Sequence, residues 1–326
     1  MTVAVFYKLL AIFLTVALGW VAGRLRWLAS GAAGSDPARV LSNAAFYIFV
    51  PALLFRTTAR LDFASQPWRT VAAFFVPVLM LAAAVYFWQR RSAPGLGTAA
   101  PSVRAISASF GNTVQLGIPL SAALFGEAGL AIHIAVVSLH ALVLLTTLTV
   151  MVELDLARAR NRHEATASTI KTLAQTLQNT IIHPVVLPVL AGLIWNATGI
   201  GLHPVVDEAL AGLGLAVVPV CLVLIGLTLA HYGLAGGARG AIGISLAKLM
   251  LLPALVLAVA HWGFGVSGLP LSVVVMMAAL PVGSTALVFS QRYATLEAEA
   301  SAAIVVSTVA FALTASFWLA LLTWMA

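Results

Sequence analysis

The residues that identify the fold class are Phe110-Gly111-Asn112-Thr113-Val114-Gln115-Leu116-Gly117-Ile118-Pro119. They place two glycines, a proline and three hydrogen-bonding side chains inside an apolar segment, residues 103–125. In a continuous helix, Pro119 would remove one N–H and clash with the carbonyl of Gln115. Backbone groups left unpaired in hydrocarbon cost several kcal/mol each, so such an interruption survives in a membrane only where protein or water satisfies it. The segment therefore predicts a spanning helix that is broken near mid-membrane.

The composition favours a membrane protein. Of the 326 residues, 62% are hydrophobic and 8% are charged, whereas a soluble domain has about 25% charged residues. A soluble core could not absorb this much apolar sequence, but one membrane domain of short-looped helices can. The formal charge of +7 is spread over loops between apolar segments, which favours a role in membrane topology over nucleic-acid binding. The single cysteine, Cys221, lies in an apolar segment, so we expect no disulfide framework and no thiolate metal site.

Ten segments are long and apolar enough to be spanning helices, which need about 20 residues each. They lie near residues 3–22, 39–57, 69–88, 103–125, 129–152, 179–198, 205–231, 240–261, 270–291 and 299–325. A polar linker, residues 153–178, divides them five and five. Because each half has an odd number of spans, two similar halves would be inverted repeats. The sequence thus predicts an all-α membrane protein with ten transmembrane helices in two inverted five-helix repeats.

The placement of Lys and Arg predicts the orientation in the membrane. One face of the predicted bundle holds Arg24, Arg26, Arg39, Arg90, Arg91, Arg104, Arg158, Arg160, Arg162, Lys171, Arg239 and Arg292. The opposite face holds only Lys8, Arg56, Arg60 and Arg69. By the positive-inside rule, the linker lies in the cytoplasm and both termini lie outside. Three arginines, Arg56, Arg60 and Arg69, cluster against this trend.

A second interruption, Leu280-Pro281-Val282-Gly283-Ser284-Thr285, lies in the ninth segment. Transporters built on inverted repeats place their sites where paired broken helices meet. Pro119 is preset for the first turn of a second half-helix, and we expect Pro281 to play the same part. The two half-helix N-termini would then direct partial positive charge toward one shared cavity. Two ordinary proline-kinked helices remain the alternative.

Polar residues beside the two breaks are the candidate substrate-binding residues. They are Asn112, Thr113, Gln115, Ser284 and Thr285, and the crossover of the helices would be formed by Gly111, Gly117, Pro119, Pro281 and Gly283. An amide such as Asn112 can donate to a carboxylate without the desolvation cost of a full charge. No acidic residue lies in the middle of a segment, and we expect Glu127, Glu297 and Glu299 to be solvated at helix ends. Amides and helix N-termini without carboxylates favour a small organic anion.

Three ionisable residues lie inside apolar segments. Lys248 is the only Lys or Arg well inside one, where a lysine costs about 2.5–3.5 kcal/mol at the bilayer centre. It is a candidate substrate-binding counter-charge or a proton-coupled switch, or it snorkels to the interface. His133 and His140 are seven residues apart and share a helix face. They form either a proton relay or a pair of hydrogen-bonded core histidines, and no carboxylate or cysteine in that segment completes a metal site.

Several motifs, taken together, carry a family resemblance. In chain order they are Asn43 with Pro51-Ala52-Leu53-Leu54-Phe55, then Gly111-Asn112-Thr113 with Gly117-Ile118-Pro119 and Phe125-Gly126, then Pro219 with Leu224-Ile225-Gly226, and last Ala279-Leu280-Pro281 with Gln291-Arg292-Tyr293. They resemble the second, fourth, seventh and ninth helices of the auxin efflux carrier family. Bacterial members of that family include permeases for malonate and related organic acids.

The resemblance implies that the broken fourth and ninth helices cross at mid-membrane. It implies a scaffold, residues 1–62 and 179–236, which often forms a dimer contact, and a mobile transport part, residues 63–152 and 237–326. The linker 153–178 is cytoplasmic in this reading. It replaces the long loop of the plant members, which argues against plant-style regulation and against auxin as the substrate.

The sequence predicts a secondary transporter of small organic anions, not an enzyme. The resemblance implies that these anions are malonate-like mono- or dicarboxylates and that they move by elevator-type alternating access. The expected partners are a co-transported proton or sodium ion, membrane lipids and a second copy in a homodimer, without nucleic acid, cofactor, catalytic residues or a metal. The expected location is a bacterial inner membrane. One alternative is a cation/proton antiporter of related fold, which the missing intramembrane carboxylates disfavour. The other is an intramembrane enzyme, for which Gly-x-Ser-x-Gly and His-Glu-x-x-His motifs are both missing.

Overall fold

The structure, a computed structural model, describes residues 3–28, 37–60, 67–114, 116–161, 186–232 and 238–325. The helices in chain order are α1 (Val3–Arg24), α2 (Pro37–Ala44), η1 (Ala45–Phe49), α3 (Val50–Ala59), α4 (Trp68–Ser92), η2 (Pro94–Leu96), α5 (Ala100–Ser109), α6 (Gly117–Asn161), α8 (Val186–Ala197), α9 (Pro204–Tyr232), α10 (Ala238–Leu246), η3 (Ala247–Leu251), α11 (Leu252–Ala258), η4 (Val259–Gly263), α12 (Gly268–Ala279), α13 (Thr285–Arg292) and α14 (Glu297–Met325). Within these ranges there is no β-strand. The prediction of an all-α chain is confirmed.

Six helical stretches among these residues are long and apolar enough to cross a membrane. They are Ala38–Ala59, Trp68–Ser92, Leu120–Leu156, Pro204–Leu224, Arg239–Gly263 and Glu297–Met325. Two shorter apolar helices, Leu187–Ala197 and Gly268–Ala279, lie between them in the chain. Each of the eight overlaps a segment that the sequence predicts to be an apolar span, and Leu120–Leu156 overlaps both the fourth and the fifth.

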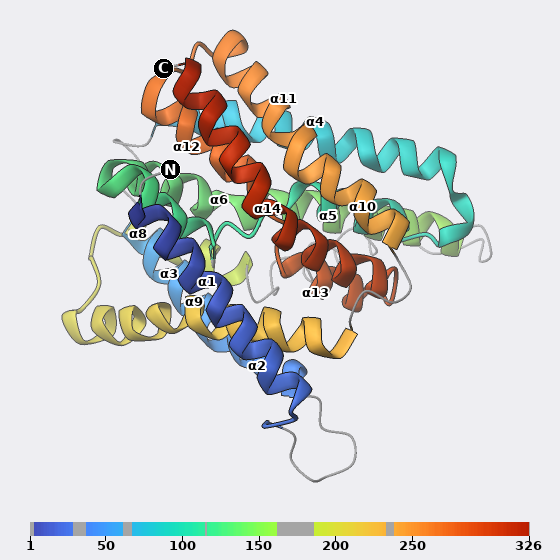
Figure 1. The fold of residues 1–326 in the computed structure, drawn as a ribbon, viewed down its shortest axis with the longest axis horizontal. Helices are drawn as coiled ribbons and strands as arrows, with labels where there is room; N and C mark the ends of the chain where they lie inside the picture. The colour runs from blue at the N-terminus through green and yellow to red at the C-terminus, as the bar shows by residue number, and fades with distance from the viewer. Residues whose placement is uncertain are drawn as a thin grey trace.

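The helices pack in two groups (Figure 1). In the first group, α1 lies along α9, and α3 packs against both α8 and α9. The second group consists of α4, α5, α6 and α10 to α14, and most of the largest hydrophobic core cluster lies in it. In Figure 1, α1, α2, α3 and α9 occupy the lower part of the view, and α4, α10, α11 and α12 the upper part. The groups meet where α6 contacts α1, α3 and α8.

Helix α6 joins the end of the fourth predicted segment to the fifth. Gly126 interrupts it with φ 63° and ψ −161°, a conformation that glycine adopts without steric cost. The helix continues to Asn161, so residues 153–161 of the predicted linker are helical. This extension is held to α4, because Asp155 accepts hydrogen bonds from Tyr86 at 2.5 Å and from Arg90 at 2.8 Å. The remainder of the linker, residues 162–178, lies outside the described residues.

The expectation that Glu299 is solvated is wrong. Its side chain begins α14 but is only 7% exposed, and both carboxylate oxygens accept hydrogen bonds from Arg104 at 2.6 Å. The same guanidinium also donates to Gln89 at 2.5 Å. A bidentate guanidinium–carboxylate pair compensates the desolvation of both charges, so the start of α14 can be buried against α5 and α4.

Two of the arginines that oppose the charge trend have a structural partner. Arg56 and Arg60, near the end of α3, both donate to the carboxylate of Asp207 on α9, with shortest distances of 2.8 Å. The two cations therefore neutralise an acidic group within the first helix group. Their position follows from helix packing, which explains why they depart from the charge pattern of the loops.

Candidate functional site

Two helices are interrupted at the positions that the sequence indicates. α5 ends at Ser109 and α6 begins at Gly117, while α12 ends at Ala279 and α13 begins at Thr285. After α12, Leu280 has φ −58° and ψ 147°. A proline disfavours the helical conformation of the residue before it, so Pro281 accounts for the end of α12.

The two interruptions pair with each other through their backbones. The N–H of Asn112 donates to the carbonyl of Pro281 at 2.8 Å, and the N–H of Gly283 donates to the carbonyl of Phe110 at 2.9 Å. Between these bonds, Gly111 and Val282 form an antiparallel bridge. Polar groups that the helix breaks release are thus satisfied inside the protein, as a hydrocarbon environment requires.

The close approach of the two chains depends on glycine. A Cβ atom on Gly283 would lie 2.8 Å from the carbonyl oxygen of Gly111, a distance that real Cβ atoms do not reach. On the other strand of the bridge, a Cβ atom on Gly111 would lie 3.3 Å from the Nζ atom of Lys248. Of the three glycines that the sequence assigns to the crossover, Gly283 has no space for a Cβ atom, a Cβ on Gly117 would lie 2.7 Å from His133, and a Cβ on Gly111 would require a small shift of Lys248.

The two prolines of the breaks differ in position. Pro119 lies in the first turn of α6, as the sequence predicts. Pro281 does not lie in the first turn of α13, which begins at Thr285, so that prediction is wrong. Its ring instead ends the preceding helix, and its carbonyl accepts the hydrogen bond from Asn112. Only one of the two half-helices is started by a proline.

A cavity with an empty volume of about 490 Å³ lies against the paired breaks, and we call it the central cavity. Its lining consists of Val50 and Leu54 from α3, residues 110–114, Val137, His140 and Ala141 from α6, and residues 283–285. The wall is mainly apolar, and none of the described residues contributes a carboxylate to it. It lies where α3 of the first helix group faces the second group.

Four of the predicted substrate-binding residues line the central cavity: Asn112, Thr113, Ser284 and Thr285. Gln115 lies outside the described residues. Lys248 is not among the lining residues, but its ammonium lies beside Gly111, which is one of them. The structure therefore brings together the polar residues of both breaks, which are far apart in the sequence.

Two buried polar side chains in this lining have unused hydrogen-bonding atoms. Asn112 is 4% exposed and its Oδ1 atom has no partner. His140 is 1% exposed, and neither ring nitrogen has a partner. Leaving a buried polar group unsatisfied costs about 1–3 kcal/mol, so each such group in a native protein calls for a ligand, a water molecule or another explanation.

The two histidines of α6 have different environments. The Nε2 atom of His133 lies 2.8 Å from the carbonyl oxygen of Thr113, so this histidine holds the first break in place. The ring of His140 instead packs against Phe110, with ring centroids 4.4 Å apart. His140 faces the central cavity and His133 does not. Of the two interpretations of the pair, a hydrogen-bonded core histidine describes His133 but not His140.

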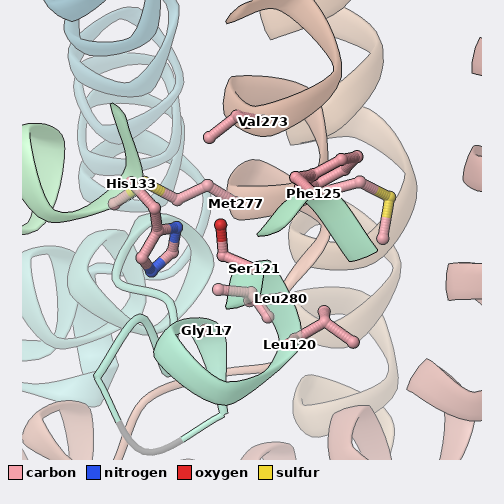
Figure 2. Close-up of a pocket in the computed structure, with 9 residues that line it drawn as sticks. Gly117, Leu120, Ser121, Phe125, His133, Val273, Met277 and Leu280 are labelled. Carbon is pink, nitrogen blue, oxygen red and sulfur yellow. The ribbon is translucent and has the colours of Figure 1, made fainter. Parts of the chain in front are cut away.

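A second, smaller pocket lies on the other side of His133 (Figure 2). Its lining is Gly117, Leu120, Ser121, Phe125, His133, Val273, Met276, Met277 and Leu280, with an empty volume of about 190 Å³. The hydroxyl of Ser121 in this pocket is buried without a partner. Because His133 also bonds to Thr113, it forms the wall between this pocket and the first break.

Lys248 is 1% exposed and does not snorkel to an interface. Its Nζ atom donates to the carbonyl oxygens of Ala278 at 2.5 Å and Leu280 at 2.6 Å. These carbonyls belong to the end of α12 and the residue that follows it. The ammonium therefore lies at the interrupted helix, directly behind the bridge that contains Gly111.

Sequence reasoning did not find all residues of this site. Val50 and Leu54 form the opposite wall of the central cavity, and they look like ordinary apolar helix residues. The hydroxyl oxygen of Ser307 on α14 accepts a hydrogen bond from the N–H of Val282 at 3.0 Å and so supports the second break. A serine in an apolar segment is a weak signal, because its hydroxyl usually bonds to its own helix.

Comparison with known proteins identifies the family of this chain. The sequence profile of a family described as "Membrane transport protein" matches residues 4–319, nearly the whole chain. The chain is similar to auxin efflux carrier component 8 of Arabidopsis thaliana, with 27% identity over 264 residues, which covers 67% of this chain and 70% of that protein. With its apolar helices and paired breaks, this chain is an integral multi-pass membrane protein that belongs to the membrane transport protein family, the family of the auxin efflux carriers.

Proposed function

We propose that this protein is a secondary transporter of small organic anions, and that malonate-like mono- or dicarboxylates bind in the central cavity. The observation that carries the proposal is the buried Asn112 amide at the paired breaks, which has unused hydrogen-bonding capacity. A side-chain amide can turn over to present either its N–H₂ donors or its oxygen. It can therefore donate to a carboxylate that enters the cavity.

Charge also favours an anion in the central cavity. Its lining has no carboxylate that would repel one. Residues 284 and 285 of the lining lie at the N-terminus of α13, where a helix carries partial positive charge. The side-chain amine of Lys248 lies beside Gly111 and adds positive charge nearby when it is protonated. A cation/proton antiporter would need acidic groups here instead.

The two helix groups support alternating access of the elevator type. In this proposal the first group, α1 to α3 with α8 and α9, is the scaffold and the dimer contact. The second group contains both breaks and is the mobile transport part. Because the central cavity lies between α3 and the breaks, a sliding movement of the second group would carry the site past the scaffold. The two groups would share ten spans in two inverted repeats.

A proton or a sodium ion is the proposed coupling ion. His140 is the candidate proton carrier, because it lines the central cavity and its two ring nitrogens have no partners among the described residues. His133 completes the proposed relay, but one of its nitrogens is already bonded to Thr113. Measuring uptake in proteoliposomes distinguishes the two ions. Uptake driven by a pH gradient indicates a proton, and uptake driven by a sodium gradient indicates sodium.

Topology remains a prediction: the linker 153–178 is cytoplasmic and both termini are outside. In a Cys221→Ser background, Ser168→Cys should not react with a membrane-impermeant thiol reagent in intact cells. It should react after the cells are opened. Labelling in intact cells would reverse the orientation.

The function is tested with purified protein in a thermal-shift screen of organic acids, at two pH values and with or without sodium. A ligand that binds only the folded state raises its melting temperature, and the rise grows with the logarithm of the ratio of ligand concentration to Kd. Acids that stabilise the protein are then tested for uptake into proteoliposomes. If no organic acid shifts the melting temperature or is transported, while a cation is, the proposal fails.

A further inference from the structure

The ammonium of Lys248 is buried without an acidic partner. Lys248 lies within Arg239–Gly263, one of the apolar helical stretches that can cross a membrane. Among the residues that the structure describes, none of the ion pairs includes it. Its hydrogen-bond partners are two backbone carbonyls, those of Ala278 and Leu280. A buried charge is costly unless its surroundings compensate it, so these carbonyls have a specific electrostatic role.

The carbonyls at this point carry the negative end of a helix. The last carbonyls of an α-helix lack intrahelical partners and hold its partial negative charge. In a continued helix, the carbonyl of Ala278 would accept the N–H of Val282, but Val282 donates to Ser307 instead. The extended conformation of Leu280 removes its own carbonyl from the helix as well. Lys248 thus supplies the positive charge that this interrupted end requires.

The surrounding backbone holds the ammonium in a fixed position. Lys248 lies in η3, a π-helical turn, and Pro253 follows in α11. Pro253 has no N–H for the carbonyl of Leu249, and this carbonyl accepts a hydrogen bond from Trp318 of α14 at 2.8 Å. On the opposite side, Gly111 leaves space for the lysine, since a Cβ there would lie 3.3 Å from Nζ and 3.4 Å from Cε.

We propose that Lys248 is a tethered cation, which permanently fills a monovalent-cation site formed by the interrupted end of α12. Its ammonium neutralises the two carbonyls and holds the end of α12 behind the bridge between Gly111 and Val282. The paired breaks then need no bound metal ion to be stable. This inference concerns the ligand-free protein and does not depend on which solute is transported.

The test removes the side chain and returns its cation as a separate molecule. Lys248→Ala deletes the equivalent of n-propylammonium and leaves the carbonyls unpaired. Thermal unfolding of the purified variant is measured with n-propylammonium, choline or 1-propanol at constant ionic strength. We expect a melting temperature below that of the unmodified protein, and saturable recovery with n-propylammonium alone. The unmodified protein should not gain stability from any of these additives.

Lys248→Met is the matched control, because methionine fills similar space without charge. It should be destabilised and should not recover with n-propylammonium. If this variant is as stable as the unmodified protein, the cation is not needed and the proposal is overturned. If Lys248→Ala yields folded protein neither with nor without n-propylammonium throughout purification, or recovers equally with choline, the proposal is also overturned. None of these results bears on organic-acid transport, which is measured separately.

Discussion

The backbone N–H of Asn112 donates to the carbonyl of Pro281 at 2.8 Å, across 169 positions of the chain. This bond and its neighbour between Gly283 and Phe110 join two helix interruptions without any side chain. The side chain of Asn112 is therefore left available at the central cavity, with its Oδ1 atom unpartnered. The backbone of this residue joins the two breaks, and its amide is the proposed solute-binding group.

Replacing this amide tests its role in binding. Asn112→Ala should weaken organic-acid binding by about 1–3 kcal/mol, the usual cost of leaving a buried partner unsatisfied. The backbone bond to Pro281 remains, so the melting temperature of the ligand-free protein should change little. Affinity is measured by ligand-induced thermal shift or calorimetry. Asn43→Ala, the same change at an exposed position of α2, is the control and should bind normally; equal affinity in both variants would exclude Asn112 from the site.

Substitution of the second unpartnered side chain, His140, tests its effect on stability and on transport separately. His140→Phe replaces two unsatisfied nitrogens by an apolar ring that fits beside Phe110, Phe74 and Phe75. The melting temperature should therefore stay the same or rise, while transport is lost. His133→Phe is the comparison, because it removes the bond to the Thr113 carbonyl and should lower the melting temperature. Normal transport by His140→Phe would show that this histidine takes no part.

The close backbone approach at the bridge depends on Gly283. Gly283→Ala would place a Cβ atom 2.8 Å from the carbonyl oxygen of Gly111. The bridge must open to relieve this overlap, and overpacking of this kind typically costs about 1–3 kcal/mol. Thermal unfolding measures the loss. Gly243→Ala in α10 is the control, since its Cβ would meet nothing within 4 Å and alanine favours a helix; similar melting temperatures for the two variants would contradict the close approach.

Because Arg104 and Glu299 form a buried ion pair, we expect their substitutions to lower the melting temperature non-additively. Removing one partner of a buried ion pair costs about 3–5 kcal/mol, and we expect somewhat less here because Arg104 is 20% exposed. The single variants Arg104→Met and Glu299→Leu should both melt well below the unmodified protein. The double variant should recover much of the loss, because no unpaired charge remains. Additive losses in this double-mutant cycle would show that the two side chains do not interact.

Local chemistry explains which parts of the fold could be predicted. Glycine, proline and hydrogen-bonding residues inside apolar segments mark both breaks, because backbone hydrogen bonding in a membrane tolerates few alternatives. The position of Pro281 could not be deduced in this way. A proline starts one helix or ends another according to the conformation of its neighbours, and here it ends α12.

The remaining differences come from contacts between distant parts of the chain. Glu299 is buried because Arg104, 195 positions away, approaches it from α5. Arg56 departs from the charge pattern because it bonds to Asp207 on α9. Lys248 donates to two backbone carbonyls at the interrupted end of α12, and no pattern in the sequence indicates which carbonyls these are. Such pairings depend on how helices pack, which local patterns do not specify.

The most direct test of the central claim is an experimental structure of the protein with the organic acid that stabilises it most in the thermal-shift screen. The account predicts the acid in the central cavity, with its carboxylate within hydrogen-bonding distance of the Asn112 amide and beside residues 284 and 285. Both helix breaks should remain paired through Asn112 and Pro281. An acid bound in the Ser121 pocket or on the surface, or unbroken helices through residues 110–116 and 280–284, would contradict it.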